Sequence, residues 1–398
     1  MSNDTVAITS QCLCRAHTFT ASVDKSLLPL RATSCHCDSC RHQTGALYLS
    51  DAAWPNEHED LSSLKKHNFS ETLVDYSCGT CGTPMFCKRT WPGAKPNVFT
   101  GTLNDAPNLI RYDDHIFVGD TLDGGATEWL RKNHLDGAQV RRWKAWHESG
   151  GKPGDELPSS WPDASVLPEP LEKVAPGSTP FHCLCRGVNL ALRSAADLAG
   201  TPGEDLPFYI DPDTHKYLVT SCACESCRRS CGIDMVSWTY ALLSHLEFAP
   251  GSADSSSAIG GFPSSVSALK EAVSAKDRDP RLGTLALYKS SPDVERYHCS
   301  RCSAQVFYAV ADRPDTIEIS VGLLSHPSGA RAEGLLRWDY ESLSEGKNEV
   351  GGWRDAFIRQ AKKEREEWRE RRGYPRVWKR VDDERQKERS VLQDKAAK

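Results

Sequence analysis

The sequence predicts a mainly β protein, with two tandem small antiparallel β domains that bind zinc and a charged helix at the C-terminus. Three observations support this prediction. One cysteine pattern occurs twice, the segments between the cysteines are short and apolar or alternating, and the end of the chain is rich in charged residues. At 398 residues the chain is long enough for two domains of ordinary size.

The repeated unit contains a C-x-C pair, then a C-x-C-x-x-C triplet, then a C-x-x-C pair. In the first half these cysteines are Cys12, Cys14, Cys35, Cys37, Cys40, Cys78 and Cys81. In the second half they are Cys183, Cys185, Cys222, Cys224, Cys227, Cys299 and Cys302. Glycines repeat with them, because Gly45 and Gly232 each follow a triplet by five residues, and Gly101-Thr102-Leu103 corresponds to Gly322-Leu323-Leu324. Such an order indicates a duplicated unit.

The repeat and the composition between its copies predict the domain boundaries. We expect a first domain at 7–147, a Pro- and Gly-rich linker at 148–178, a second domain at 179–340 with an insertion at about 250–283, and a charged helical tail at 341–398. Strands are expected at 72–77, 97–103, 217–221, 306–310 and 316–321, and short helices near 125–132 and 267–275.

The tail has no helix breaker from Arg354 to Arg372. Its apolar stripe is thin, with Phe357, Ala361 and Trp368, and charged pairs are spaced for a solvated surface. We expect an exposed helix lying on the body of the protein. A partner-binding arm is the alternative.

Composition limits the class of protein. The chain has no run of 18 apolar residues and no basic and apolar signal at its N-terminus, so neither a membrane span nor secretion is expected. A reducing compartment follows, the cytoplasm with the nucleus as the alternative, and there sixteen cysteines indicate metal ligands more than a disulfide framework. The net charge of -5 does not indicate a nucleic-acid groove.

Seven cysteines per copy divide into four and three. Zinc prefers four tetrahedral ligands, and a structural site is closed by four protein groups. One closed site per copy would use Cys12, Cys14, Cys78 and Cys81, and again Cys183, Cys185, Cys299 and Cys302. Alternatives are an irregular cluster in which His36 or His298 closes a second site, and a zinc ribbon that only binds partners.

Each triplet would give a second zinc three thiolates and leave one position open. Three thiolates on a divalent ion leave a net charge of about -1, so the site is a poor generator of hydroxide and a better host for a thiol ligand. Cys87 and Cys231 have no counterpart in the other copy and are expected to be spare buried thiols. Arg41, Arg228 and Arg229 beside the triplets could meet a substrate carboxylate or lie solvated.

The order of these motifs resembles the GFA/CENP-V family, named for the glutathione-dependent formaldehyde-activating enzyme and centromere protein V. The first copy carries Cys12-Leu13-Cys14, the triplet with Arg41, Cys78-Gly79-Thr80-Cys81-Gly82, and His115-Ile116. The second copy matches at every cysteine but has Ala223 in place of His36, and Ser300 and Ser303 in place of the glycines. His115 itself is expected to be structural.

The resemblance implies two β-tent-like domains, each with two zinc ions, hence up to four per chain. It implies that the four-cysteine sets are structural and that the triplets, as open zinc sites, are catalytic. The implied activity is that of a carbon–sulfur lyase acting on a thiol–aldehyde adduct such as S-hydroxymethylglutathione, with glutathione as co-substrate. Arg41 and Arg228, from their place beside the triplets, are candidates to bind it.

Two functions from different classes therefore remain. The first is a zinc-dependent carbon–sulfur lyase with a small-molecule thiol as partner and the first domain as the active one. The second is a non-catalytic zinc-stabilised protein that recruits a protein partner through its C-terminal helix.

Overall fold

The computed structural model describes residues 4–149, 152–249, 260–346 and 351–384. The first half of the chain forms a hairpin, β1 and β2, and a sheet of eight strands in the order β10-β9-β3-β4-β8-β7-β6-β5. The bounds are β1 Thr5–Gln11, β2 Thr18–Asp24, β3 Leu30–Cys35, β4 Leu49–Ala53, β5 Lys65–Ser70, β6 Leu73–Ser77, β7 Pro84–Arg89, β8 Pro96–Phe99, β9 Ile110–Ile116 and β10 Arg141–Arg142, with helix α1 at Asp38–Thr44.

The second half repeats this arrangement. A three-stranded sheet, β13-β14-β17, accompanies a sheet of seven strands in the order β18-β19-β20-β21-β16-β15-β22. The bounds are β13 Ser178–His182, β14 Asn189–Arg193, β15 Tyr217–Cys222, β16 Val236–Leu242, β17 Leu246–Phe248, β18 Leu285–Ser291, β19 Val294–Cys299, β20 Gln305–Val310, β21 Thr316–Ser320 and β22 Leu336–Ser344, with helices α2 Glu225–Cys231 and α3 Val266–Ser274.

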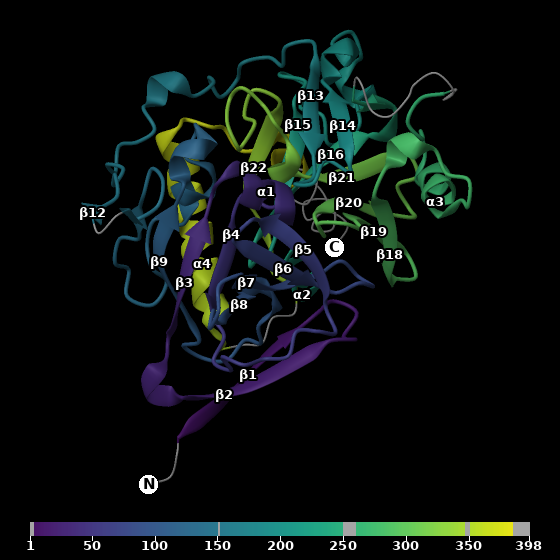
Figure 1. Ribbon diagram of the computed structural model, residues 1–398. Coiled ribbons are helices and arrows are strands. Elements are labelled where there is room, and N and C mark those ends of the chain that lie inside the picture. The colour runs from purple at the N-terminus through teal and green to yellow at the C-terminus, as the bar shows by residue number, and fades with distance from the viewer. Residues whose placement is uncertain (1–3, 150–151, 250–259, 347–350, 385–398) are drawn as a thin grey trace, which may run out of the picture.

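The two large sheets have the same topology. In each, the strand that leads into a cysteine triplet pairs in parallel with a later strand of its copy, β3 with β9 and β15 with β22. The strands that follow in the order of each sheet pair antiparallel. Four of the five expected strands lie within one residue of their expected bounds, but 97–103 is a strand only as far as Phe99, since Thr100–Thr102 forms a 3-10 turn. The helix expected near 267–275 is α3. In Figure 1 the β1–β2 hairpin lies at one end of the molecule and β13 and β14 lie toward the other.

The two copies meet through the repeated glycines. The N–H of Gly101 donates to the carbonyl of Gly232 over 3.1 Å, and the N–H of Gly322 donates to the carbonyl of Gly45 over 2.9 Å. Gly45 and Gly232 end α1 and α2 in the left-handed conformation that glycine adopts at a helix C-terminus. A Cβ on Gly101 would lie 2.1 Å from the backbone nitrogen of Ile233, so the repeat keeps glycine where backbones touch.

Further contacts between the copies also come in matched pairs. The N–H of Leu184, in the C-x-C pair of the second copy, donates to the carbonyl of His42 in α1 over 2.8 Å. Arg229 in α2 in turn donates to Oε1 of Gln11, beside the C-x-C pair of the first copy, over 2.6 Å. Each triplet helix therefore packs beside the four-cysteine cluster of the other copy.

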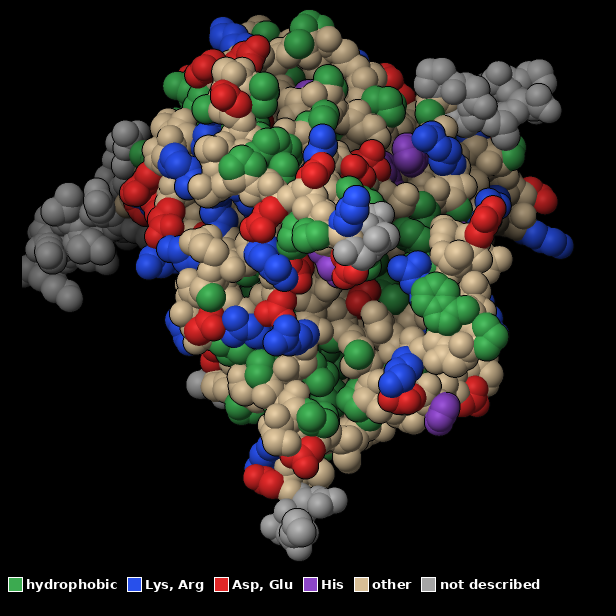
Figure 2. All heavy atoms as spheres, turned by 60° about the vertical axis from the view of Figure 1, so that its left-hand side comes forward, with side chains coloured by type: hydrophobic (Ala, Val, Ile, Leu, Met, Phe, Trp, Pro, Cys, Tyr) green, Lys and Arg blue, Asp and Glu red, His purple; other side chains and the backbone are tan. Residues whose placement is uncertain are grey.

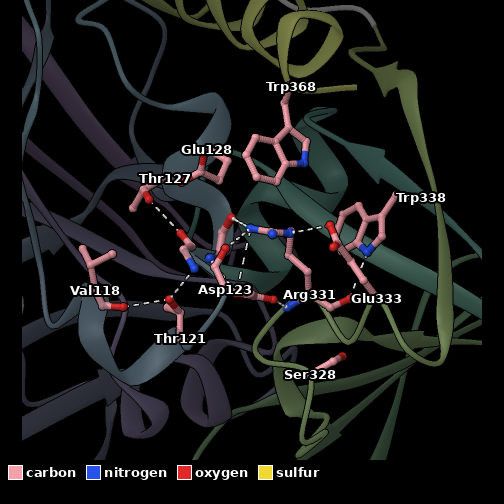
Figure 3. Close-up of polar contacts among 12 residues, drawn as sticks. Val118, Thr121, Asp123, Thr127, Glu128, Ser328, Arg331, Glu333, Trp338 and Trp368 are labelled. Carbon is pink, nitrogen blue, oxygen red and sulfur yellow. Dashed lines mark hydrogen bonds and ion pairs between the residues drawn. The ribbon is translucent and has the colours of Figure 1, made fainter. Parts of the chain in front are cut away.

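A buried arginine joins the copies at a second place (Figure 3). The Arg331 backbone N–H donates to Oδ2 of Asp123 over 2.6 Å, its guanidinium donates to the carbonyl of Gly125 over 3.0 Å, and its Nε donates to Oε1 of Glu333 over 2.8 Å. The ring of Trp368 lies 4.8 Å from the guanidinium. Asp123 belongs to the first half of the chain and Arg331 to the second, so this network fixes one against the other.

The C-terminal helix lies on the body of the protein as expected, but the expectation that it is exposed is wrong. Helix α4, Trp353–Arg371, contacts both β22 and the 3-10 turn at Gly125–Trp129, and buries Trp353, Phe357 and Trp368. Arginines on its inner face are buried as well because carbonyl groups accept their hydrogen bonds. Arg365, for example, donates to the carbonyl oxygens of Tyr340 and Asp339 over 3.0 and 2.9 Å.

Arg354 shows how α4 holds both copies. Its Nε donates to Oδ1 of Asp234 over 3.0 Å, and its terminal nitrogen donates to the carbonyl of Thr100 over 2.6 Å. The expected boundary at 340 falls within β22, so part of the expected tail is a strand of the second sheet. Residues 385–398 lie outside the described residues.

One face of the molecule carries a mixture of charges. On the face drawn in Figure 2, Lys and Arg side chains are interspersed with Asp and Glu. No helix among the described residues is long and apolar enough to cross a membrane.

Candidate metal centres and the cavities beside them

Fourteen cysteine sulfurs gather into four groups, and within each group all ligand atoms lie within 4.8 Å of one another. Two groups contain four sulfurs, those of Cys12, Cys14, Cys78 and Cys81 and those of Cys183, Cys185, Cys299 and Cys302. Two groups contain three, those of Cys35, Cys37 and Cys40 and those of Cys222, Cys224 and Cys227. All sixteen cysteines are described and all are free, so a disulfide framework is not formed.

The sulfur spacing fits a tetrahedral zinc ion. The Sγ atoms of Cys12 and Cys14 lie 3.5 Å apart, as do those of Cys14 and Cys78, and the Cys183–Cys185 distance is 3.6 Å. Zn–S bonds of about 2.3 Å in a tetrahedron would put sulfurs about 3.8 Å apart. The four-cysteine groups could therefore hold a metal ion with little rearrangement.

Donors around the closed groups suit thiolate ligands. Backbone N–H groups of His17 and Val188 donate to the sulfurs of Cys12 and Cys183 over 3.3 and 3.2 Å. The Thr284 hydroxyl lies 2.9 Å from the sulfur of Cys299. Such contacts orient metal ligands and disperse their negative charge.

Each triplet lies where a strand turns into a short helix. In the first copy β3 ends at Cys35, Cys37 caps α1, and the Cys40 N–H donates to the Cys37 sulfur over 3.4 Å. Hydrogen bonds from Cys35 and Cys40 lower the pKa of the Cys37 thiol to about 3. In the second copy the same contacts lower the pKa of Cys224 to about 2. Each triplet therefore contains one sulfur that is readily a thiolate.

Histidine does not complete either triplet. Among the described residues no fourth His, Cys, Asp or Glu joins these groups. His36 instead lies 3.0 Å from Nδ1 of His115, whose Nε2 lies 2.7 Å from the carbonyl of Leu130. Burial lowers the pKa of both rings, so both are neutral structural residues. The alternative in which His36 or His298 closes a second site is not supported.

The first triplet opens into a cavity of about 400 Å³ whose wall includes Asp51, Asp75 and Cys87. Asp75 is only 4% exposed; its Oδ2 accepts a hydrogen bond from Gln43 over 2.6 Å, and its Oδ1 has no partner among the described residues. Asp51 accepts hydrogen bonds from Asn97 over 2.8 Å and from the Cys87 thiol over 3.6 Å.

These groups titrate unusually. Burial raises the pKa of the Asp75 carboxyl well above its usual range, and the charge of Asp51 raises it further. Burial also raises the pKa of Asp51 and that of the Cys87 thiol. A carboxyl group with a raised pKa can donate a proton when it is protonated and accept one when it is ionised.

The second triplet opens into a separate cavity of about 480 Å³. Its wall includes Arg296, Tyr308, Arg313 and Glu318. Arg313 and Glu318 form an ion pair over 2.6 Å. Burial raises the pKa of Glu318 to about 7, against the opposing charge of Arg313.

The arginines beside the triplets do not line these cavities. Arg228 is buried and donates to the carbonyl oxygens of Gly101 and Leu103 over 2.6 and 3.0 Å, which makes it a link between the copies. Arg41 is also buried and pairs with Asp38. Of the two spare thiols, Cys87 borders the first cavity, whereas Cys231 is buried in the core.

Sequence reasoning missed Asp51, Asp75 and Arg296. They come from β4, β6 and β19, and only the pairing of strands brings them to the triplets. The one available signal was the repeat itself, since Asp75 and Arg296 each stand three residues before the first cysteine of the C-x-x-C pair.

Comparison with known families finds a match in the first copy. The sequence pattern of the family described as Glutathione-dependent formaldehyde-activating enzyme matches residues 7–120. This range includes the first triplet, the first four-cysteine group, Asp51 and Asp75. No curated protein matches the chain. The match does not reach the second copy, and the link to centromere protein V stays a prediction.

Proposed function

We propose that the first copy is a zinc-dependent carbon–sulfur lyase that makes and breaks a thiol–aldehyde adduct such as S-hydroxymethylglutathione. The observation that carries the proposal is a three-sulfur group, open on one side, in the wall of a cavity that also contains a buried carboxyl group with a free oxygen. The family match over residues 7–120 supports an enzyme that handles glutathione and formaldehyde.

Cys35, Cys37 and Cys40 would hold the metal. Zinc bound there supplies a soft positive charge that stabilises the substrate sulfur as a thiolate. The four-cysteine groups would hold structural zinc, because their positions are filled by protein ligands. The chain would then contain up to four zinc ions.

Asp75 is the group best placed to move the proton. In cleavage, its carboxylate accepts the hydroxyl proton of the adduct; the carbon–sulfur bonding pair leaves with sulfur, and the carbonyl forms. In the reverse direction the protonated carboxyl returns that proton to the carbonyl oxygen as sulfur attacks carbon. Gln43 fixes one carboxyl oxygen and leaves the other free for this exchange.

Exchange NMR of a glutathione–formaldehyde mixture tests the reaction. We expect the wild type to speed up exchange between free and adduct carbon, Cys37→Ser to abolish this acceleration, and Cys224→Ser to keep it. Cys231→Ser is the matched control, because Cys231 is a buried cysteine outside every sulfur group. Wild-type exchange no faster than in buffer would rule out the lyase for this substrate.

A further inference from the structure

The second cavity is not a replica of the first. The two copies share a strand order, so positions in β6 and β19 correspond. Asp75 pairs with Cys87 across the first sheet, and Arg296 pairs with Tyr308 at the same place in the second. A carboxyl group in one cavity is therefore replaced by a guanidinium in the other.

Arg296 is directed at the triplet. Its terminal nitrogens lie 3.6 Å from the sulfur of Cys227, 2.8 Å from the hydroxyl of Ser226 and 3.2 Å from that of Ser230. The side chain is 2% exposed, and its guanidinium lies 5.0 Å from the ring of Tyr308. Packing and hydrogen bonds therefore hold it in one position.

The charge of Arg296 has no carboxylate partner among the described residues. Glu318, the acidic residue in this cavity wall, forms its ion pair with Arg313 instead. The Nε of Arg296 is buried and has no acceptor among the described residues. The sulfur of Cys227 is the anionic group that Arg296 does reach, so its charge offsets that of the three-thiolate group and leaves this site less negative than the first.

The first cavity has the opposite character next to its triplet. Asp51 and Asp75 are present, and the cations in its wall, Lys88, Arg89 and Lys95, are partly or fully exposed. With three thiolates on a zinc ion at about -1, Arg296 offsets that charge in the second cavity, whereas the first cavity has Asp75 in the corresponding place and no buried cation among the described residues of its wall.

We propose that the second cavity is a binding site for a small soft anion, such as the thiolate of a small thiol, held between the open position of the Cys222–Cys224–Cys227 group and the guanidinium of Arg296. The first cavity, by contrast, takes a thiohemiacetal adduct, whose sulfur carries no charge. The proposal rests on metal binding by the triplets, which is part of the proposed function, and not on carbon–sulfur exchange.

Cobalt substitution makes the two sites visible separately. Full-length protein is loaded with Co²⁺ and titrated with thiocyanate, and the d–d and sulfur-to-cobalt absorption bands are followed. Cys37→Ser removes a ligand of the first open site, so in that chain the second site is the one that responds to thiocyanate. Cys224→Ser removes a ligand of the second open site, so in that chain the first site responds. We expect thiocyanate to bind at least about tenfold more tightly to the second site, since a hydrogen bond to a charged group is worth about 1.5–3 kcal/mol.

Two further variants test the role of Arg296. In the Cys37→Ser chain, Arg296→Gln is expected to weaken thiocyanate binding about tenfold or more, and Arg296→Lys less. Lys289→Gln, which removes an exposed charge on the neighbouring strand β18, is expected to leave the affinity for thiocyanate unchanged. Should Arg296→Gln fail to load cobalt, the comparison of the two open sites still tests the proposal, since it needs no substitution at Arg296.

The same measurements can overturn the proposal. Equal thiocyanate affinity of the two sites, or unchanged affinity in Arg296→Gln, would each do so. Because these bands report binding and not turnover, loss of glutathione–formaldehyde exchange in the wild type would end the lyase proposal and leave this one standing.

Discussion

The backbone N–H of Gly101 donates to the carbonyl oxygen of Gly232 over 3.1 Å, and this bond joins the two copies of the repeat. Its counterpart joins Gly322 to Gly45 over 2.9 Å. Both contacts bring backbone against backbone, so any side chain at Gly101 or Gly322 must displace the other copy.

Gly101→Ala should therefore destabilise the whole protein. A Cβ there would lie 2.1 Å from the nitrogen of Ile233 and 2.4 Å from the carbonyl carbon of Gly232, neither of which can rotate away. Overpacking of this kind costs about 1–3 kcal/mol or more, measurable by urea unfolding. Gly200→Ala is the control, since nothing lies within 4 Å of a Cβ there. An equal loss of unfolding free energy in both variants would contradict the conclusion that Gly101 is needed for the contact between the copies.

Arg354→Ala should unfold both copies more easily. The substitution leaves Asp234 buried without its cation and removes the hydrogen bond to the carbonyl of Thr100. Breaking a buried ion pair from one side costs about 3–5 kcal/mol. Thermal unfolding followed by tryptophan fluorescence measures it, with Arg359→Ala as the control on the exposed face of α4. A free C-terminal arm would predict no difference between these variants.

Asp75→Asn should slow exchange and change the pH dependence of stability. An amide cannot accept the hydroxyl proton, so exchange is expected to fall about a hundredfold or more. Because burial and Asp51 raise the pKa of Asp75 in the folded state, the folded chain retains this proton at pH values where the unfolded chain has lost it. This carboxyl therefore destabilises the wild type increasingly as the pH rises above the pKa of the unfolded chain.

The asparagine variant removes that dependence. The free energy of unfolding of this variant should exceed that of the wild type by a larger amount at pH 7 than at pH 4, as measured by urea titration at both pH values. A variant that lost stability equally at the two pH values would show that Asp75 is ionised in the folded protein.

Zinc should leave the protein in two phases. The wild type is expected to contain four ions per chain, and a strong chelator should remove two quickly, because each triplet leaves a position where the chelator can bind. The other two should leave slowly, with loss of structure followed by circular dichroism, since four thiolates enclose them. A total of two ions per chain would mean that the triplets are empty.

Local spacing explains what the sequence could predict. C-x-C and C-x-x-C pairs are short units, so the division of sulfurs into groups of four and three followed from counting. Alternation of apolar residues placed segments such as β15 and β20 within one residue of their bounds. The identical order of the cysteine motifs in the two halves of the chain also revealed the duplication.

Long-range pairing explains what the sequence could not predict. Asp51 and Asp75 come from strands that are not neighbours in the sheet and meet only across the cavity. Helix α4 was misjudged for a different reason. Hydropathy scores Arg354 and Arg365 as solvated, whereas each donates hydrogen bonds to carbonyl oxygens inside the protein.

The reciprocal glycine contacts also bear on how the two cavities came to differ. In a dimer of two identical chains, every substitution would occur in both subunits. An arginine that replaced the carboxyl group in one cavity would therefore replace it in the other cavity as well. Covalent fusion of the copies removes that constraint. One half can keep Asp75 while the other acquires Arg296, so a single chain can hold two unlike chemistries on one shared scaffold.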